Sequence, residues 1–308
     1  MGSIKRRAFT LIELLVVIAI IGILSALIVV GMNSTTQKAT IAKAQVFSNS
    51  LRNSLMSNLV SEWRLDNASG ATATDSWSGG NNGTLTAFAN TTAGYGDSHT
   101  SGWMSSSNCI SGTCLKFDGT DDYVIVPHNA SLNFGNNSFT LSLWVQTTMA
   151  GNVSGISVLS KATSGSPYWN LLITRDLSHI EFFNYYPSQP YQYFSGAYYM
   201  VNDGKWHLLT LVENYGVNGM LYIDGRYQST HAQAWGSPDN SANNLTIGGS
   251  SYNGLLDDVR IFNAAMPTSQ IQQMYFAGLS KLFAKNQITQ SEYQQRLANL
   301  PANNFAKE

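Results

Sequence analysis

Hydrophobic and polar positions change their pattern along the chain. Residues 11–30 are apolar or uncharged except for Glu13. Residues 32–59 contain no proline and carry apolar positions at near-helical spacing. From residue 60 onward, short alternating runs are separated by Gly-, Asn-, Ser- and Thr-rich turns, which is typical of β-strands. Helical spacing returns near the C-terminus.

The first apolar run is long enough to cross a membrane. About 20 residues at 1.5 Å each span a bilayer core of about 30 Å. Lys5, Arg6 and Arg7 directly precede it, and cations of this kind remain on the cytoplasmic side. We therefore expect a single-pass protein with its N-terminus in the cytoplasm and the rest outside. One helix is predicted over residues 9–59, roughly 75 Å long.

Glu13 is unusual because a carboxylate in hydrocarbon costs on the order of 3 kcal/mol and needs a partner. The surrounding segment, Arg7-Ala8-Phe9-Thr10-Leu11-Ile12-Glu13 followed by the apolar run, resembles the N-terminus of type IV prepilins. An ordinary secretory signal has a shorter apolar core, and neither it nor a simple anchor accounts for this glutamate.

The resemblance implies that prepilin peptidase cuts between Ala8 and Phe9 and that the new amino group is methylated. Residues 1–8 would then be a leader peptide. The family usually has Gly before the cut, whereas this chain has Ala8. The amino group of Phe9 could pair with Glu13 of a neighbouring subunit and set the stagger between subunits.

The alternating region predicts an all-β antiparallel jelly-roll sandwich after the long N-terminal helix. A short C-terminal helical tail is expected to follow it. We predict strands at residues 60–66, 115–117, 123–126, 139–145, 169–174, 180–185, 206–212, 220–223, 245–247 and 256–262. Asp118-Gly119-Thr120 and Asp224-Gly225 read as hairpin turns. Trp144 and Trp206 lie in alternating strands and are expected in the core.

The order of several landmarks resembles the laminin-G-like, concanavalin A-like jelly roll. They are Trp63-Arg64-Leu65-Asp66, Leu115-Lys116-Phe117-Asp118-Gly119, Phe139-Thr140-Leu141-Ser142-Leu143-Trp144, Gly204-Lys205-Trp206-His207 and Leu256-Asp257-Asp258-Val259-Arg260. The resemblance implies one domain over residues 60–277, closed by a short helix at residues 269–277. Residues 278–308 form an additional tail with two helical stretches, which could cover the head or contact a neighbour.

Composition excludes some partners. Charged residues make up 11% of the 308 residues, and the net charge is −1. Lys and Arg do not cluster beyond residues 5–7, so we expect no nucleic-acid partner.

Cys109 and Cys114 can close a short disulfide in an oxidising compartment, whereas zinc would need two more ligands.

The head lacks the signatures of a hydrolase. Jelly-roll glucanases carry paired carboxylates on one strand, which this chain does not have. The five histidines occur in unrelated contexts. We therefore predict no catalytic residues and no enzyme activity.

Calcium is the cofactor considered for the head, because it takes carboxylate and carbonyl oxygens. The candidate ligands are Asp66, Asp75, Asn82 and Asp257. If the first and last strands are neighbours, Asp66 and Asp257 could face one loop. The alternative is that these residues cap their own turns.

The densest aromatic stretch suggests a carbohydrate ligand. Tyrosine offers a flat apolar face with a polar rim, and the candidates are Tyr185, Tyr186, Tyr191 and Tyr193. Packing within the sandwich is the alternative role.

Together these features indicate a type IV pilin-like subunit that polymerises through its N-terminal helix and displays a lectin-like head for adhesion. Its expected partners are pilin subunits, prepilin peptidase, the inner-membrane pilus assembly machinery, the membrane and a cell-surface carbohydrate. It would reach an extracellular pilus after assembly. Alternatives are a minor pilin or type II secretion pseudopilin, and a membrane-anchored carbohydrate-binding protein that does not polymerise.

Overall fold

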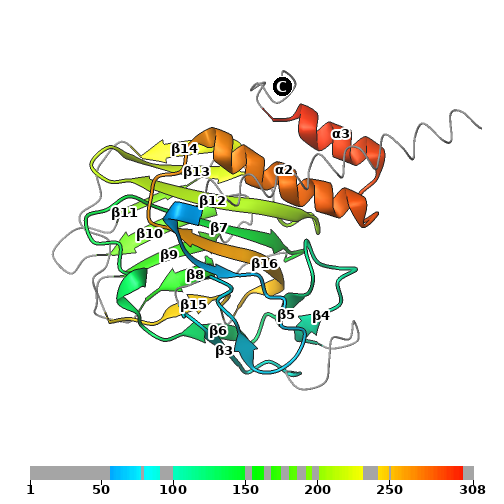
Figure 1. Cartoon of the computed structure of the whole chain (residues 1–308), viewed down its shortest axis with the longest axis horizontal. Coiled ribbons are helices and arrows are strands. Elements are labelled where there is room, and N and C mark those ends of the chain that lie inside the picture. The colour runs from blue at the N-terminus through cyan, green and yellow to red at the C-terminus, as the bar shows by residue number, and fades with distance from the viewer. Residues whose placement is uncertain are drawn as a thin grey trace, which may run out of the picture.

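The computed structural model describes residues 56–77, 80–90, 100–149, 155–162, 168–174, 180–185, 192–195, 201–231, 242–249 and 251–300. Within these ranges the strands form two eight-stranded antiparallel sheets, stacked as the two layers of a sandwich (Figure 1). The predicted jelly-roll head is therefore confirmed. The predicted N-terminal helix lies outside the described residues, apart from its last few positions.

Sheet A carries the first and last strands of the head. Its order is β14 (Arg226–His231), β13 (Asn218–Ile223), β12 (Trp206–Asn214), β7 (Phe139–Gln146), β16 (Asn253–Phe262), β5 (Cys114–Asp118) and β4 (Gly102–Met104), and β1 (Leu59–Trp63) also pairs with β16. Asp224 and Gly225 have φ of 54° and 71°, so they form the predicted hairpin turn between β13 and β14.

Sheet B forms the second layer. Its order is β11 (Gln192–Ser195), β10 (Ile180–Tyr185), β9 (Tyr168–Ile173), β8 (Ile156–Lys161), β15 (Leu245–Ile247), β6 (Tyr123–Val126), β3 (Gly83–Thr86) and β2 (Thr72–Ala73). A 3-10 turn, η2 (Ala130–Leu132), lies between β6 and β7 in the chain.

The main core lies between the sheets. In β7, Phe139, Leu141, Leu143 and Val145 belong to this core, whereas Trp144 belongs to a second apolar cluster. Both faces of β7 are thus buried, and residues 139–145 are all buried. This explains why the strand lacks a solvated polar face.

Two helices cover the outer face of sheet A, as Figure 1 shows. α2 (Thr268–Ala284) and α3 (Gln290–Ala298) contribute side chains to the second cluster together with Trp144, Trp206 and Tyr222 of the sheet. The predicted tail therefore covers the head. A Cβ added to Gly278 would lie 2.1 Å from Cζ2 of Trp144, so α2 approaches the sheet closely at this glycine.

The structure corrects three predicted boundaries. The closing helix does not end at Ala277 but continues to Ala284, because Leu279, Leu282 and Phe283 extend its buried stripe. The predicted domain limit at residues 277/278 thus falls inside α2.

The N-terminal helix was predicted to run to Leu59. Instead, a 3-10 turn, η1 (Met56–Asn58), leads into β1 at Leu59, which pairs with Phe262. β1 ends at Trp63 and not at residue 66, and Leu65 has a positive φ of 55° just beyond it.

Candidate functional site

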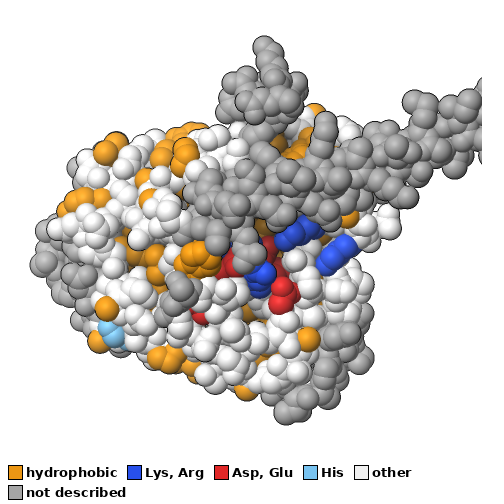
Figure 2. Space-filling model, viewed as in Figure 1, with side chains coloured by type: hydrophobic (Ala, Val, Ile, Leu, Met, Phe, Trp, Pro, Cys, Tyr) orange, Lys and Arg blue, Asp and Glu red, His pale blue; other side chains and the backbone are white. Residues whose placement is uncertain are grey.

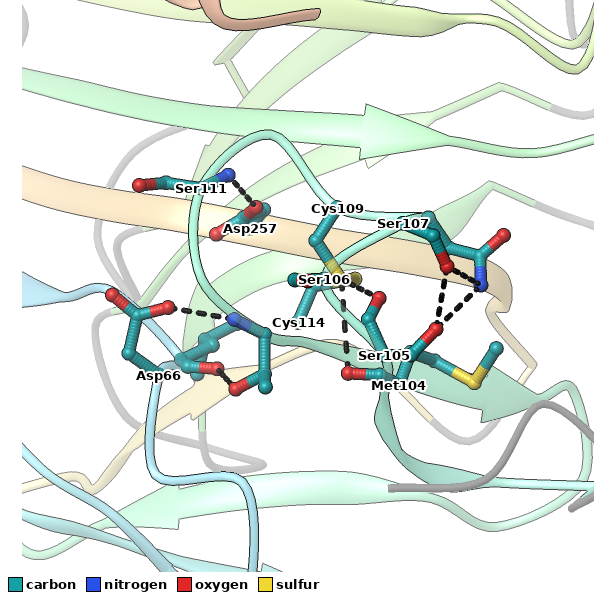
Figure 3. Close-up of a disulfide and its surroundings, with 12 residues drawn as sticks. Asp66, Met104, Ser105, Ser106, Ser107, Cys109, Ser111, Cys114 and Asp257 are labelled. Atoms are coloured by element: carbon teal, nitrogen blue, oxygen red, sulfur yellow. Dashed lines mark hydrogen bonds between the residues drawn. A yellow bond between two sulfur atoms is a disulfide. The ribbon is translucent and has the colours of Figure 1, made fainter. Parts of the chain in front are cut away.

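The disulfide loop, residues 109–114, is the point where several parts of the head meet. Cys109 and Cys114 form the predicted disulfide, and both are fully buried. Figure 3 shows the loop between Asp66 and Asp257. Lys285 Nζ at the end of α2 donates to the carbonyl oxygens of Ser106 and Cys109, at 2.9 and 3.0 Å. The loop therefore links the sandwich to the helical hairpin.

Asp66 and Asp257 both bind this loop. The Thr113 amide donates to Oδ1 of Asp66 at 2.8 Å, and the Ser111 amide donates to Oδ2 of Asp257 at 3.2 Å. The pairing of β1 with β16 brings the two aspartates to the same loop, as the argument from neighbouring strands predicted.

The electrostatics of the two adjacent aspartates differ. Burial raises the pKa of Asp257 well above its ordinary value, and the negative charges of Asp258 and Asp66 add to this effect. Oδ1 of Asp257 is buried and has no hydrogen-bond partner among the described residues. Burial also opposes ionisation of Asp258, but Arg260 and Lys281 outweigh it and hold the pKa of Asp258 below its ordinary value.

Asp258 belongs to an ion-pair network across β1, β16 and α2. Arg260 bridges Glu62 at 2.9 Å and Asp258 at 3.1 Å, while Arg64 contacts Glu62 and Lys281 contacts Asp258. Acidic and basic side chains lie together near the middle of the face shown in Figure 2. The network ties the first strand to the last strand and to the helix above them.

The remaining two calcium candidates have different partners. Asp75 accepts hydrogen bonds from the amides of Glu62, Trp77 and Asn81 at 3.0–3.1 Å. Oδ1 of Asn82 accepts from the Asp75 amide at 2.9 Å. The hydrogen bonds thus divide the four predicted ligands into two pairs, Asp66 with Asp257 and Asp75 with Asn82. The hydrogen bonds of Asp75 and Asn82 match the alternative in which these residues cap turns.

Sequence reasoning missed another group of carboxylates. Ligand oxygens of Asp118, Asp121 and Asp122 lie within 4.8 Å of one another, so this group could bind a metal ion. Burial raises the pKa of Asp122 to about 6, although the Asp118 amide bonds its carboxylate at 2.8 Å. The signal was present in the sequence as three aspartates within the five residues 118–122.

Two of the four tyrosine candidates, Tyr185 and Tyr193, belong to the β10–β11 end of sheet B. Tyr185 pairs with Tyr168 of β9, and Tyr193 pairs with Phe183 of β10. Tyr186 and Tyr191 lie outside the described residues. The pairing places two of the four candidates in adjacent strands of the sheet that α2 and α3 do not cover.

A buried histidine forms a polar site that the sequence did not indicate. His207 Nδ1 lies 2.8 Å from Oδ2 of Asp224, and Nε2 lies 3.0 Å from Oδ1 of Asp203. Burial opposes protonation, but the two carboxylates outweigh it and raise the pKa of His207 to about 9. The imidazolium therefore holds the start of β12 to the β13–β14 turn.

The predicted processing and assembly residues, Ala8, Phe9 and Glu13, lie outside the described residues. Among the described helices, none is long and apolar enough to span a membrane.

Two sequence families match the chain. The profile of the concanavalin A-like lectin/glucanases superfamily matches residues 118–272, which is half of the chain. The chain therefore belongs to this superfamily. The prokaryotic N-terminal methylation motif, which is the type IV pilin signal, matches residues 4–29. A comparison with curated proteins finds no match.

Solved structures share the fold at low sequence identity. The binding domain of Paraclostridial Mosquitocidal Protein 1 has a TM-score of 0.57 and 14% identity, covering 73% of this chain and 53% of that chain. Domain 4 of AbnA, a GH43 extracellular arabinanase from Geobacillus stearothermophilus, solved with arabinotriose, has a TM-score of 0.54 and 16% identity, covering 71% of this chain and 98% of that chain.

A botulinum neurotoxin type C structure, from work on its interaction with two ganglioside molecules, has a TM-score of 0.55 and 16% identity. It covers 73% of this chain and 52% of that chain, so the match spans about half of each of the two toxin chains. At these identities the similarity concerns the fold. The family and the N-terminal motif point to a non-enzymatic binding protein that is anchored in a membrane before export.

Proposed function

We propose that the chain is a type IV pilin-like subunit that polymerises through its N-terminal helix and presents its head as an adhesin. The observation that carries this proposal is the joining, in one chain, of a methylation motif at residues 4–29 with a lectin-like head. A disulfide in that head suits an oxidising, extracytoplasmic location.

Assembly would depend on Phe9 and Glu13. Prepilin peptidase removes residues 1–8, and the amino group of Phe9 then carries a positive charge. A buried carboxylate is tolerated in lipid when a cation pairs with it, so Glu13 meets Phe9 of an adjacent subunit. The partners in this scheme are pilin subunits and the inner-membrane assembly machinery, with the N-terminus in the cytoplasm until extraction.

Replacing Glu13 tests the assembly step. Glu13→Ala should abolish or shorten surface filaments while the protein stays in the membrane, and Thr10→Ala in the same segment should assemble normally. Electron microscopy of sheared filaments measures their number and length, and immunoblots of membrane fractions measure how much protein stays in the membrane. Normal filaments from Glu13→Ala would exclude polymerisation through this pair and favour the anchored carbohydrate-binding protein. Short filaments in the wild type would favour the minor pilin or pseudopilin.

Adhesion would use the outer face of sheet B. The helices α2 and α3 occupy the outer face of sheet A, and the two tyrosine positions in described strands, Tyr185 and Tyr193, belong to sheet B. Two structures of similar fold are described with arabinotriose or in relation to gangliosides, which supports a glycan as the ligand.

A glycan array with the full chain in detergent tests this site. Tyr185→Ala and Tyr193→Ala should weaken binding by roughly tenfold, as expected for an aromatic anchor. Tyr227→Ala is the control, because Tyr227 is 50% exposed on β14 of the other sheet. Equal losses in all three variants would contradict a site on sheet B.

Calcium is the cation that we propose for the head, because it prefers carboxylate oxygens. The group of Asp118, Asp121 and Asp122 and the pair of Asp66 and Asp257 are the two candidate sites. Calcium should raise the melting temperature of the wild type. Asp121→Asn should remove this shift if the first group binds the ion, and Asp66→Asn if the second does. Unchanged melting of the wild type would exclude both.

A further inference from the structure

A continuous row of paired residues crosses all eight strands of sheet B. Paired positions follow one another from β2 to β11 without interruption. In order they are Thr72, Thr84, Ile125, Thr246, Ser160, Asn170, Phe183 and Tyr193. Directly opposed residues of an antiparallel pair share one face of the sheet. With strands about 4.8 Å apart, this cross-strand row spans roughly 34 Å.

The row lies on the outer face of the sheet. The residues that alternate with it along the strands, such as Leu85, Val124 and Leu171, belong to the core between the sheets. Thr72 and Thr84 are exposed, Ile125, Thr246 and Asn170 are half-buried, and Ser160 is buried. Both described helices pack on sheet A. Among the described side chains of the row, Thr72, Thr84, Ile125, Thr246 and Asn170 are therefore at least partly accessible to a ligand, whereas Ser160 is not.

The row contains no ionisable carboxylate or cation. Hydroxyl and amide groups stand at five of the eight positions, and Ile125, Phe183 and Tyr193 supply aliphatic or aromatic residues. Ser157 Oγ donates to Oδ1 of Asn170 at 2.8 Å, which orients this amide on the face. Next to the row on the same face, the described positions are Thr86, Tyr123, Ser157, Leu172 and Glu181. Of these five residues, Glu181 is the charged one.

This chemistry selects among glycans. Carboxylated, sulfated or sialylated sugars are held by Arg or Lys through charge-assisted hydrogen bonds, and no such side chain stands in the row. Neutral sugars need hydroxyl and amide partners together with apolar surface for the ring faces. A platform of roughly 34 Å is also much longer than a single sugar.

Building on the lectin role proposed above, we infer that the outer face of sheet B binds an extended, uncharged polysaccharide that runs across the strands. Affinity should rise with chain length, because each additional sugar reaches a further strand. Competition by salt should be weak, since no ion pairs form.

Equilibrium binding of the full chain in detergent tests this inference. The probes are linear arabinan, mannan and a soluble β-glucan as uncharged chains, and polygalacturonate, heparin and a sialylated ganglioside as charged ones. At least one uncharged polymer should bind, more tightly than its own short oligomers. Thr246→Asp and Asn170→Ala should each weaken it by roughly tenfold or more. Thr230→Asp, on the edge strand of sheet A, should leave it unchanged, and circular dichroism verifies the folding of each variant.

The outcomes separate this inference from the proposed function. Binding of charged glycans alone, or neutral binding that both variants leave intact, would overturn the sheet B platform while the lectin role stands. Absence of binding to all six probes would overturn both the platform and the adhesive role. The filament assay with Glu13→Ala measures assembly and does not depend on glycan binding.

Discussion

At the scale of single residues, two buried ionisable side chains make the head sensitive to pH. His207 is held as an imidazolium between Asp203 and Asp224, and burial keeps Glu213 neutral, with its pKa raised to about 8. Glu213 lies opposite Phe139 of β7, and its buried Oε1 has no partner among the described residues. Both groups lower the free energy of unfolding as the pH rises, but over different pH ranges.

His207 should stabilise the head below neutral pH. Its pKa is about 9 in the fold against 6.5 when unfolded, so its contribution is complete below pH 6.5 and is lost as the pH rises through about 9. The difference is worth at most about 3 kcal/mol. Chemical denaturation between pH 6 and 10 should show this loss in the wild type and a flatter profile in His207→Gln. His128→Gln, at an exposed site, should follow the wild type. Parallel profiles of wild type and His207→Gln would contradict the assignment.

Glu213 should destabilise the head as the pH rises. It takes up its proton more readily in the fold than in the unfolded chain, so stability falls from pH 4.5 to about 8 and then levels off. Glu213→Gln removes this titration, which is worth at most about 5 kcal/mol. We expect the variant to lose less stability than the wild type between pH 5 and pH 8 in urea denaturation. An equal loss in both proteins would show that the carboxyl group is not shielded.

At the scale of elements, the disulfide loop and the helical hairpin stabilise each other. The loop binds Asp66 after β1, Asp257 of β16 and Lys285 at the end of α2. Gln287 Nε2 also donates to the Cys109 carbonyl, at 2.9 Å. These residues are far apart in the chain and come together only in the folded head, so the loop is a junction between elements.

Removing the disulfide tests this junction. A loop of this length is expected to contribute about 2 kcal/mol by restricting the unfolded chain. The double variant Cys109→Ser with Cys114→Ser should lose that amount in chemical denaturation, and reduced wild type should behave like the variant. Because both cysteines are buried, a thiol reductant should reduce the disulfide of the native protein slowly. Unchanged stability of the double variant would show that the surrounding hydrogen bonds hold the loop unaided.

The local pattern predicted some strands with correct limits and missed others, among them β3, β8 and β11. The strands at residues 123–126, 180–185 and 245–247 have the predicted limits. β14 was missed because Arg226–His231 is polar, and its position at the edge of the sheet requires no apolar face. β2 and β4 were missed because two or three residues cannot establish a period.

At the scale of the whole molecule, the N-terminal motif and the head are separate functional parts. The motif directs anchoring and export, while the head belongs to a superfamily of lectin-like folds. Only the head contains the described site residues. The proposed processing of residues 1–8 can therefore be tested without reference to ligand binding.

Intact mass of the protein from membranes or filaments should show loss of residues 1–8 and one added methyl group. The reason is that, in the scheme proposed above, cleavage before Phe9 creates the amino group used in assembly. Ala8→Arg places a large cation at the cut and should leave residues 1–8 attached. An unprocessed wild type in cells with active prepilin peptidase would contradict the processing scheme and remove the proposed partner of Glu13.

Local chemistry in the chain was sufficient to establish the apolar N-terminal run with its glutamate, the alternation of the strands, the Asp224-Gly225 turn and the short disulfide. Each depends on residues close together in sequence. The fold was needed to bring Asp257 to Ser111, which are 146 positions apart, and to align Thr72 with Tyr193 across eight strands. It was also needed to show that the described helices α2 and α3 pack on sheet A rather than on sheet B. Such relations depend on strand order and register, and these follow from how apolar surfaces pack together over long separations.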